Sequence, residues 1–216
     1  MAGLETHFFS GTDALVRELE KDVESFRTGS LCLEDFTRNA TARTCALEAS
    51  LRGVSDFRDA CDSARTFTPS RNQRVYSQPI SESRHYRITL LGIHRQFPVP
   101  VHDHPGMISL VLVLEGQLYA PQYEVTPHGS ANILVELTPR SEQTLKRGDI
   151  AIVMSETGSL HSLKPLVSNA LCLTLQLYIE QTNELRSWYF PRTLAKQGMP
   201  PALWYRIQHK EICNGI

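Results

Sequence analysis

The chain has 216 residues, of which 41% are apolar and 21% charged, a composition that suits a folded globular protein and excludes a chain disordered throughout. Its 22 basic and 23 acidic residues nearly cancel, so no long-range charge would attract it to nucleic acid or to an anionic membrane surface. The five cysteines form an odd set without C-x-x-C spacing, and the N-terminus lacks the apolar segment of a secretion signal. No apolar run is long enough to span a membrane. We therefore expect a cytoplasmic monomer that binds neither nucleic acid nor membrane.

The first 70 residues predict three helices. Apolar side chains recur at helical spacing over residues 12–29 and again over residues 33–53, where Thr44 interrupts the apolar face. Residues 55–65 predict a short third helix. Because apolar helix faces of this kind usually pack on a larger core, we expect residues 1–70 to form a helical extension on the domain that follows.

The remaining residues, 71–216, predict short strands separated by turns that contain glycine or proline. The β-forming segments are residues 86–93, 107–114, 117–125, 133–137, 150–154, 160–163 and 170–179. Short strands at roughly even spacing predict a closed β-barrel or a β-sandwich. The Glu115-Gly116 turn is expected to join its two flanking strands as a hairpin.

Two histidines, His102 and His104, lie just before the apolar strand that begins at residue 107. Side chains alternate along extended backbone, so the rings of these two residues point to the same face, a geometry that suits a metal. About 57 residues after His104, the segment Gly158-Ser159-Leu160-His161 supplies a third histidine from a distant strand. For the other five histidines, an ordinary surface or core position is the better interpretation.

These segments resemble the two motifs of the cupin fold, a double-stranded β-helix. The first cupin motif is H-x-H-x4-E-x6-G, and here Gly116 stands at the glycine while Ser109 stands at the glutamate. The second motif has the form G-x-x-H, which ends at His161. The resemblance implies a mainly β cupin barrel preceded by helices.

The hexapeptide His102-Asp103-His104-Pro105-Gly106-Met107 resembles the H-D-H-P-G-M signature of the thiol dioxygenases that include the plant cysteine oxidases and 2-aminoethanethiol (cysteamine) dioxygenase. The resemblance covers roughly residues 85–190. It implies an Fe(II) ion held by His102, His104 and His161 without a carboxylate, which agrees with serine at position 109. It also implies that O2 oxidises a thiol to a sulfinic acid, the thiol being a small aminothiol such as cysteamine or the N-terminal cysteine of a peptide or protein.

The C-terminal half follows the spacing of this family but not all of its residues. The family has a D-[IV]-L-x-P-P-Y segment and, eight residues after its tyrosine, a C-x-Y-Y segment. If Tyr178 is that tyrosine, Cys172 replaces the aspartate, and Trp188 and Tyr189 stand at the two later tyrosines. The candidate catalytic residues are therefore Tyr178, Tyr189 and Cys172, with ordinary core positions as the alternative for each.

Other interpretations stay open at this point. The replaced aspartate favours a non-catalytic cupin that binds a metal or small molecule as a sensor. A non-redox cupin enzyme such as an isomerase is a third, weaker interpretation. Three histidines would also suit zinc, which has no redox role, so iron is implied by the family and not by the spacing. Asp103, on the opposite face of the extended segment, is expected to support the site without binding the metal.

Overall fold

The computed structural model describes residues 6–7, 12–70, 73–104, 107–126, 134–154, 160–178, 186–194 and 202–210. For residues 6–7, 125–126, 134–136, 173–178, 186–194 and 202–210 it describes the backbone only.

Three helices begin the described chain: α1 (Asp13–Arg27), α2 (Leu33–Leu51) and α3 (Ser55–Thr66), and all three match the prediction. The helices bury apolar side chains at helical spacing, as Val16, Leu19 and Val23 do in α1. Thr44 interrupts the apolar face of α2 but is tolerated there because its hydroxyl donates to the Ala40 carbonyl at 2.7 Å. No helix in the described part of the chain combines the length and apolar character needed to cross a membrane.

The described strands are β1 (Thr6–His7), β2 (Val75–Glu82), β3 (Tyr86–His94), β4 (Val99–His102), β5 (Met107–Glu115), β6 (Gln117–Tyr119), β7 (Gln122–Thr126), β8 (Leu134–Ser141), β9 (Thr144–Lys146), β10 (Ile150–Met154), β11 (Leu160–Pro165), β12 (Asn169–Tyr178), β13 (Arg186–Leu194) and β14 (Ala202–Lys210).

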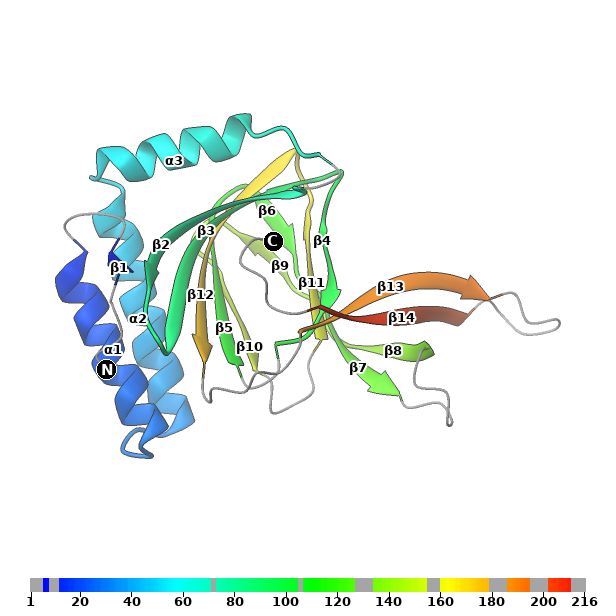
Figure 1. Cartoon of the computed structure of the whole chain (residues 1–216), viewed down its shortest axis with the longest axis horizontal. Helices are drawn as coiled ribbons and strands as arrows, with labels where there is room; N and C mark the ends of the chain where they lie inside the picture. The colour runs from blue at the N-terminus through cyan, green and yellow to red at the C-terminus, as the bar shows by residue number, and fades with distance from the viewer. Residues whose placement is uncertain are drawn as a thin grey trace.

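These strands form two curled antiparallel sheets. The first sheet has the order β1-β2-β3-β12-β5-β10, and the second has the order β4-β13-β14-β8-β7-β11-β6-β9 with an additional pairing of β4 with β11. The sheets curve around a common interior, and the three helices cover the outer side of the first sheet (Figure 1). The predicted mainly β barrel with N-terminal helices is therefore confirmed.

The first sheet separates two apolar clusters. One cluster joins the helices to the outer face of the sheet, and the other fills the space between the two sheets. Strand β5 contributes to both, since Leu110 and Leu112 belong to the helix-side cluster while Val111 and Val113 belong to the interior cluster. Burial on both faces explains the nearly continuous apolar run of this strand.

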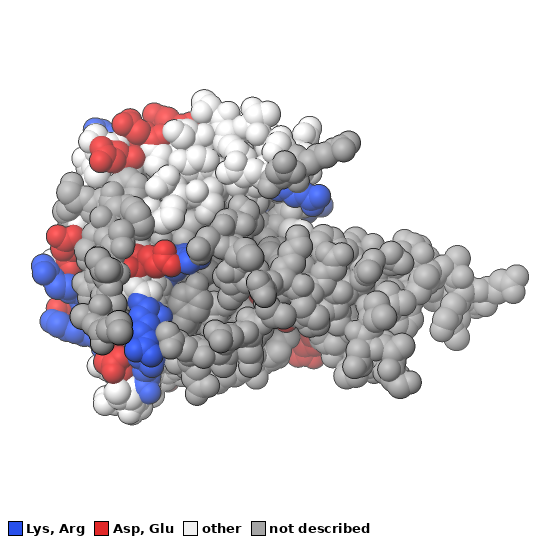
Figure 2. Space-filling model, viewed as in Figure 1, with Lys and Arg blue, Asp and Glu red and all other residues white. Residues whose placement is uncertain are grey.

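The outer surface of the helices is polar and mixed in charge. Figure 2 shows basic and acidic side chains close together over this part of the molecule. Arg43 of α2 pairs with Glu18 and Asp22 of α1, at 3.4 and 3.5 Å. Such exposed pairs add little stability each, about 0–1 kcal/mol, and the alternation of sign gives this surface no strong attraction for polyanions.

The corner after β5 and the strand that follows it differ from the sequence prediction. The expected hairpin across Glu115-Gly116 is wrong, because β5 pairs with β12 and β10 in the first sheet whereas β6 pairs with β9 and β11 in the second. Gly116 makes this corner with a positive φ of 81°, and a Cβ there would lie 2.5 Å from the Asn169 carbonyl oxygen. The predicted strand over residues 117–125 is in fact two strands, separated at Ala120 and Pro121.

The predicted boundary between a helical extension and a β domain, near residue 70, stays a prediction. The helices and the first sheet share one apolar cluster, which contains Phe36 and Leu51 from α2 beside Ile88 and Leu110 from the sheet.

Candidate metal centre

The structure brings the three predicted histidines together. His102 is the last residue of β4, His104 follows two residues later, and His161 lies near the start of β11. Each is only 2–3% exposed, and their potential ligand atoms all lie within 4.8 Å of one another. The ring centroid of His102 is 4.7 Å from that of His104 and 4.3 Å from that of His161. Three imidazoles thus share one buried spot inside the barrel.

The pairing of β4 with β11 explains how distant residues meet. His161 is the cross-strand partner of His102, and Leu163 is the partner of Val99. Two steps along β11 therefore match three steps along β4, which is the signature of a β-bulge at Pro100 and Val101. Cross-strand partners share a face, so the bulge turns His102 toward the interior face that Val99 and Leu163 also occupy. In a regular strand, His102 and Val99 would point to opposite faces.

The same bulge orients the His102 ring. Its Nδ1 lies 2.8 Å from the carbonyl oxygen of Pro100. A carbonyl can only accept, so Nδ1 must carry the proton and donate it to this bond, which leaves the lone pair on Nε2. A backbone partner of this kind is the usual device that fixes the tautomer and direction of a metal-binding histidine. Pro100 was not among the predicted site residues, because a bulge has no spacing signal in the sequence.

The residues present fit a divalent transition metal. Metal–imidazole bonds are about 2.0–2.1 Å long, so one ion would reach all three rings after small side-chain rotations. Packing three polar rings into a barrel interior costs free energy that a shared cation would recover by taking one lone pair from each. Within the described residues, the cluster contains no carboxylate. The donor set is therefore three neutral nitrogens, which suit zinc, copper, iron or nickel better than calcium or magnesium.

The neighbouring predicted residues take no direct part. Ser109 lies on β5, is 1% exposed and is not a member of the cluster, so the carboxylate of the general cupin motif has no substitute at that position. Asp103 is half-buried between the two ligands and is likewise outside the cluster. Pro105, Gly106 and Gly158 lie outside the described residues.

Cys172 is not brought to the centre. It is fully buried in the interior apolar cluster, opposite Leu91 on β3 and Val113 on β5. Burial raises the pKa of its thiol to about 12, so the thiol stays protonated at neutral pH. On β5, Val113 lies six residues from Met107, a residue whose N–H donates to the His104 carbonyl at 3.1 Å. Six residues of strand span roughly 20 Å along β5, and the Cys172 thiol is not a member of the histidine cluster.

The two candidate tyrosines lie on strands close to the centre. In the backbone register, Tyr178 of β12 is opposite Met107, and Tyr189 of β13 is opposite Val101. Trp188 is opposite His102 itself. The side chains of these three residues lie outside the described part of the chain, so the role of the tyrosines stays a prediction.

A second residue that the sequence did not single out is Gln122. It begins β7 and is the cross-strand partner of His161. The pairing of β7 with β11 joins segments nearly forty residues apart, and no local sequence motif predicts it. The side chain is half-buried, and its Nε2 donates to the Ile152 carbonyl of β10 at 3.3 Å.

Comparison with known proteins finds distant structural neighbours. No family model and no curated relative matches the sequence. Among solved structures, the Cnp3 cupin domain of Schizosaccharomyces pombe superimposes with a TM-score of 0.39 and 11% identity, over 53% of this chain and 70% of that one. A conserved protein with a double-stranded β-helix domain from Klebsiella pneumoniae gives 0.37 and 18%, over 55% and 88%. A cupin superfamily protein from Desulfitobacterium hafniense gives 0.35 and 17%, over 53% and 85%.

The names of these three neighbours describe a cupin or a double-stranded β-helix. At 11–18% identity and TM-scores below 0.4 they carry no argument about this chain, and its activity is argued from the centre itself.

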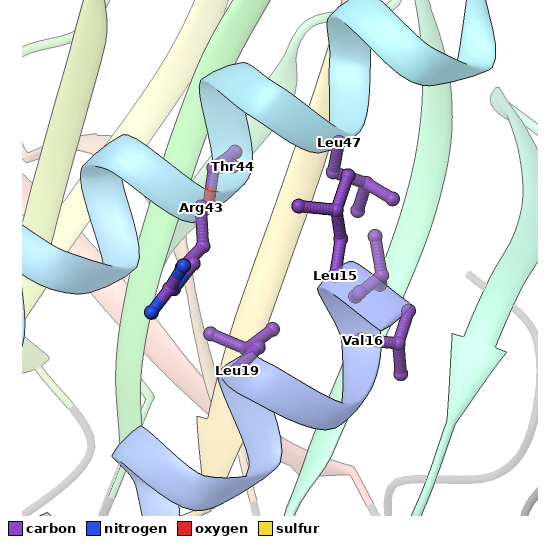
Figure 3. A pocket seen from close by; sticks show the side chains of 7 residues that line it. Leu15, Val16, Leu19, Arg43, Thr44 and Leu47 are labelled. Atoms are coloured by element: carbon purple, nitrogen blue, oxygen red, sulfur yellow. The ribbon is translucent and has the colours of Figure 1, made fainter. Parts of the chain in front are cut away.

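A small hollow lies between the helices and the outer face of the first sheet, away from the histidine cluster. Figure 3 shows it between α1 and α2, with Leu15 and Leu19 on one side and Arg43, Thr44 and Leu47 on the other. Its cavity volume of about 10 Å³ has room for about one water molecule. A pocket of this size is a packing gap between helices and not a substrate site.

Proposed function

We propose that the three-histidine centre binds Fe(II) and that the protein is a thiol dioxygenase. The observation that carries this proposal is the donor set: three buried imidazoles within 4.8 Å of one another, in a cluster to which no carboxylate of the described residues belongs. The H-D-H-P-G-M resemblance of residues 102–107 narrows the chemistry to the oxidation of a thiol. The proposed substrates are cysteamine and the N-terminal cysteine of a peptide or protein, which both carry an amine near the thiol.

The electrostatics of the centre favour an anionic substrate atom. Three neutral ligands leave the whole positive charge of a divalent ion to be balanced, whereas a carboxylate would cancel part of it. A thiol that enters this site is therefore stabilised as its thiolate. Bound Fe(II) would supply the open coordination positions and the redox chemistry by which R–SH and O2 combine to R–SO2H, with both oxygen atoms transferred to sulfur.

The chain's own contribution is to orient the histidine rings and to enclose the centre in an apolar interior. The Pro100 carbonyl holds the His102 ring in one tautomer, and the seam between β4 and β11 fixes His161 beside it. Apolar side chains line the same interior, with Val99 and Leu163 nearest in register, so water is largely excluded from the reacting groups.

The test measures metal and turnover together. Protein purified without oxygen should contain close to one iron per chain, and it should consume oxygen with cysteamine or with a Cys-initiated peptide. The N-acetylated form of that peptide should react at least about a hundredfold more slowly, because it loses the amine that we expect to bind beside the thiol; each tenfold corresponds to about 1.4 kcal/mol of barrier. Equal rates for the two peptides would reject a role for the amine.

A second function has one observation in its favour. Cys172 stands where the dioxygenase family has an aspartate, and it lies in an apolar cluster as a protonated thiol. That replacement favours a cupin that binds a metal or small molecule without catalysis. Iron-loaded protein that consumes no oxygen with any of the three thiols, yet binds one of them, would support this alternative.

A further inference from the structure

A row of side chains crosses the second sheet at the metal centre. His161 on β11 is the cross-strand partner of His102 on one side and of Gln122 on the other. Partners in an antiparallel pair place their side chains on the same face, with Cβ atoms about 4.5–5.5 Å apart. The Cβ of Gln122 therefore lies beside that of His161, on the face that carries the histidine cluster.

The orientation of the Gln122 side-chain amide is fixed by the opposite sheet. Ile152 lies on β10, the edge strand of the first sheet, and its carbonyl oxygen accepts a hydrogen bond from Gln122 Nε2 at 3.3 Å. Only the NH2 end of an amide can donate to a carbonyl, so this contact decides which end faces β10. The Oε1 atom consequently points away from Ile152. Gln122 is half-buried, so its side chain is partly accessible.

We propose that Gln122 is the substrate-positioning residue of the centre, with Oε1 accepting a hydrogen bond from the amino group of an aminothiol. This inference rests on the proposed function and narrows its substrate class to thiols that carry a free amine a few bonds from sulfur. An amine that leaves water for the barrel interior must find an acceptor for its N–H groups. A neutral amide oxygen provides one without cancelling the charge that holds the thiolate.

Gln122 has an ordinary structural role that the test must separate from this one. Its hydrogen bond to Ile152 ties the edge of the first sheet to the second, and losing that tie would lower stability whatever the ligand. A structural role alone would affect all thiols equally. A positioning role would affect only those that carry the amine.

The experiment measures equilibrium binding and needs no turnover. Wild-type protein and Gln122→Met are loaded with Co(II), and cysteamine and 1-propanethiol, which has the same shape without the amine, are titrated without oxygen while the visible absorption of the metal is followed. We expect the Kd of cysteamine to rise about tenfold or more in Gln122→Met and the Kd of 1-propanethiol to change less than twofold. Gln117→Met, at an exposed position on the neighbouring β6, serves as the matched control and should leave both values unchanged.

The outcomes separate the two proposals. Equal changes for the two thiols in Gln122→Met, or no change for either, would overturn the role of Gln122 while leaving the proposed function intact. Wild-type Co(II) protein that binds neither thiol would overturn the proposed function itself. Thermal unfolding of each variant shows how much of any loss comes from the tie to Ile152.

Discussion

The outer face of the first sheet and the inner face of the second sheet differ in the side chains that they bury. The first carries fully buried apolar side chains such as Ile88 and Leu110, which share one apolar cluster with the helices. The second carries His102 and His161 at paired strand positions, with His104 two residues after β4, and this cluster is held by a bulge, a backbone carbonyl and the pairing of β4 with β11. The helix-covered face lies on the other side of the first sheet from the histidine cluster, so each should be alterable with little effect on the other.

The comparison also shows what each layer requires. Apolar packing tolerates many sequences provided volume and pattern are kept. The histidine face requires particular atoms in particular directions, and its bulge at Pro100 and Val101 departs from regular strand geometry to provide them.

The largest expected effect comes from removing one ligand. His104→Ala should lower metal affinity by at least about a hundredfold, since even the loss of an outer hydrogen-bond partner costs about 10–100-fold. The metal-free protein should keep its fold, because the helix-side cluster is untouched. Metal analysis after gel filtration, with circular dichroism of the metal-free forms, checks both statements. A His104→Ala protein that retained one metal per chain would remove His104 from the centre.

The reciprocal change is made in the helix-covered layer. Leu110→Ala should lower the free energy of unfolding by about 2–5 kcal/mol, because the side chain is fully buried and leaves a cavity between β5 and the helices. The folded fraction should still bind one metal. Leu166→Ala, at a site 40% exposed, is the control and should change stability by less than about 0.5 kcal/mol. Loss of metal from folded Leu110→Ala protein would show that the two layers are coupled.

A third prediction concerns the apolar half of the barrel interior. With its pKa raised to about 12 by burial, Cys172 has a thiolate fraction of about 10⁻⁴ at pH 8, and it is also shielded from reagents. Native protein treated with iodoacetamide should therefore be modified at Cys172 at least about a hundredfold more slowly than at Cys32 and Cys45, which are exposed. Peptide mass spectrometry gives the rates, and unfolded protein is the control. Rapid labelling of Cys172 in the native protein would show that reagents and solvent reach the interior apolar cluster.

The smallest effect is expected where α1 meets the first sheet. Burial, followed by the nearby charges of Arg27 and Arg84, lowers the pKa of His85 from its ordinary value of 6.5. Arg27 Nη1 lies 2.9 Å from His85 Nε2, which must accept this bond as a neutral ring. A group with a lowered folded-state pKa stabilises the fold above its unfolded pKa and loses that contribution as pH falls below it.

Wild-type stability should thus fall between pH 7 and pH 5 by slightly more than that of His85→Asn, with a difference of about 0.5 kcal/mol or less for so exposed a contact. Urea unfolding of both proteins at the two pH values measures this difference. A steeper fall in His85→Asn would contradict the direction of the shift.

Local patterns in the sequence were enough to predict the helices and the cluster of three histidines. Periodic apolar residues predicted α1, α2 and α3 because helix contacts lie within a few residues, and the i, i+2 histidines with a later G-x-x-H predicted the cluster. Strand β2 was missed because it contains Pro79 and few buried residues. A proline fits there because β2 pairs mainly with β3 and has a register shift between Pro79 and Ser81.

What escaped prediction depends on pairing between remote segments. The corner at Gly116 looks like a hairpin turn until the partners of β5 and β6 are known, and these partners lie far along the chain. The bulge before His102 exists only in relation to β11, and Gln122 matters only because β7 pairs with the same strand. Sequence spacing carries no information on such registers.

The pairing of β4 with β13 has a consequence for how the protein is made. All three histidines leave the ribosome before residues 186–194, yet β4, only four residues long, is bordered on one side by that later strand. The histidine-bearing strand therefore gains its second neighbour only after residues 186–194 have been synthesised, while the N-terminal helices are already free to form. Metal loading should accordingly follow the synthesis of residues 186–194, and chains that stop before residue 186 should carry the motif without the metal.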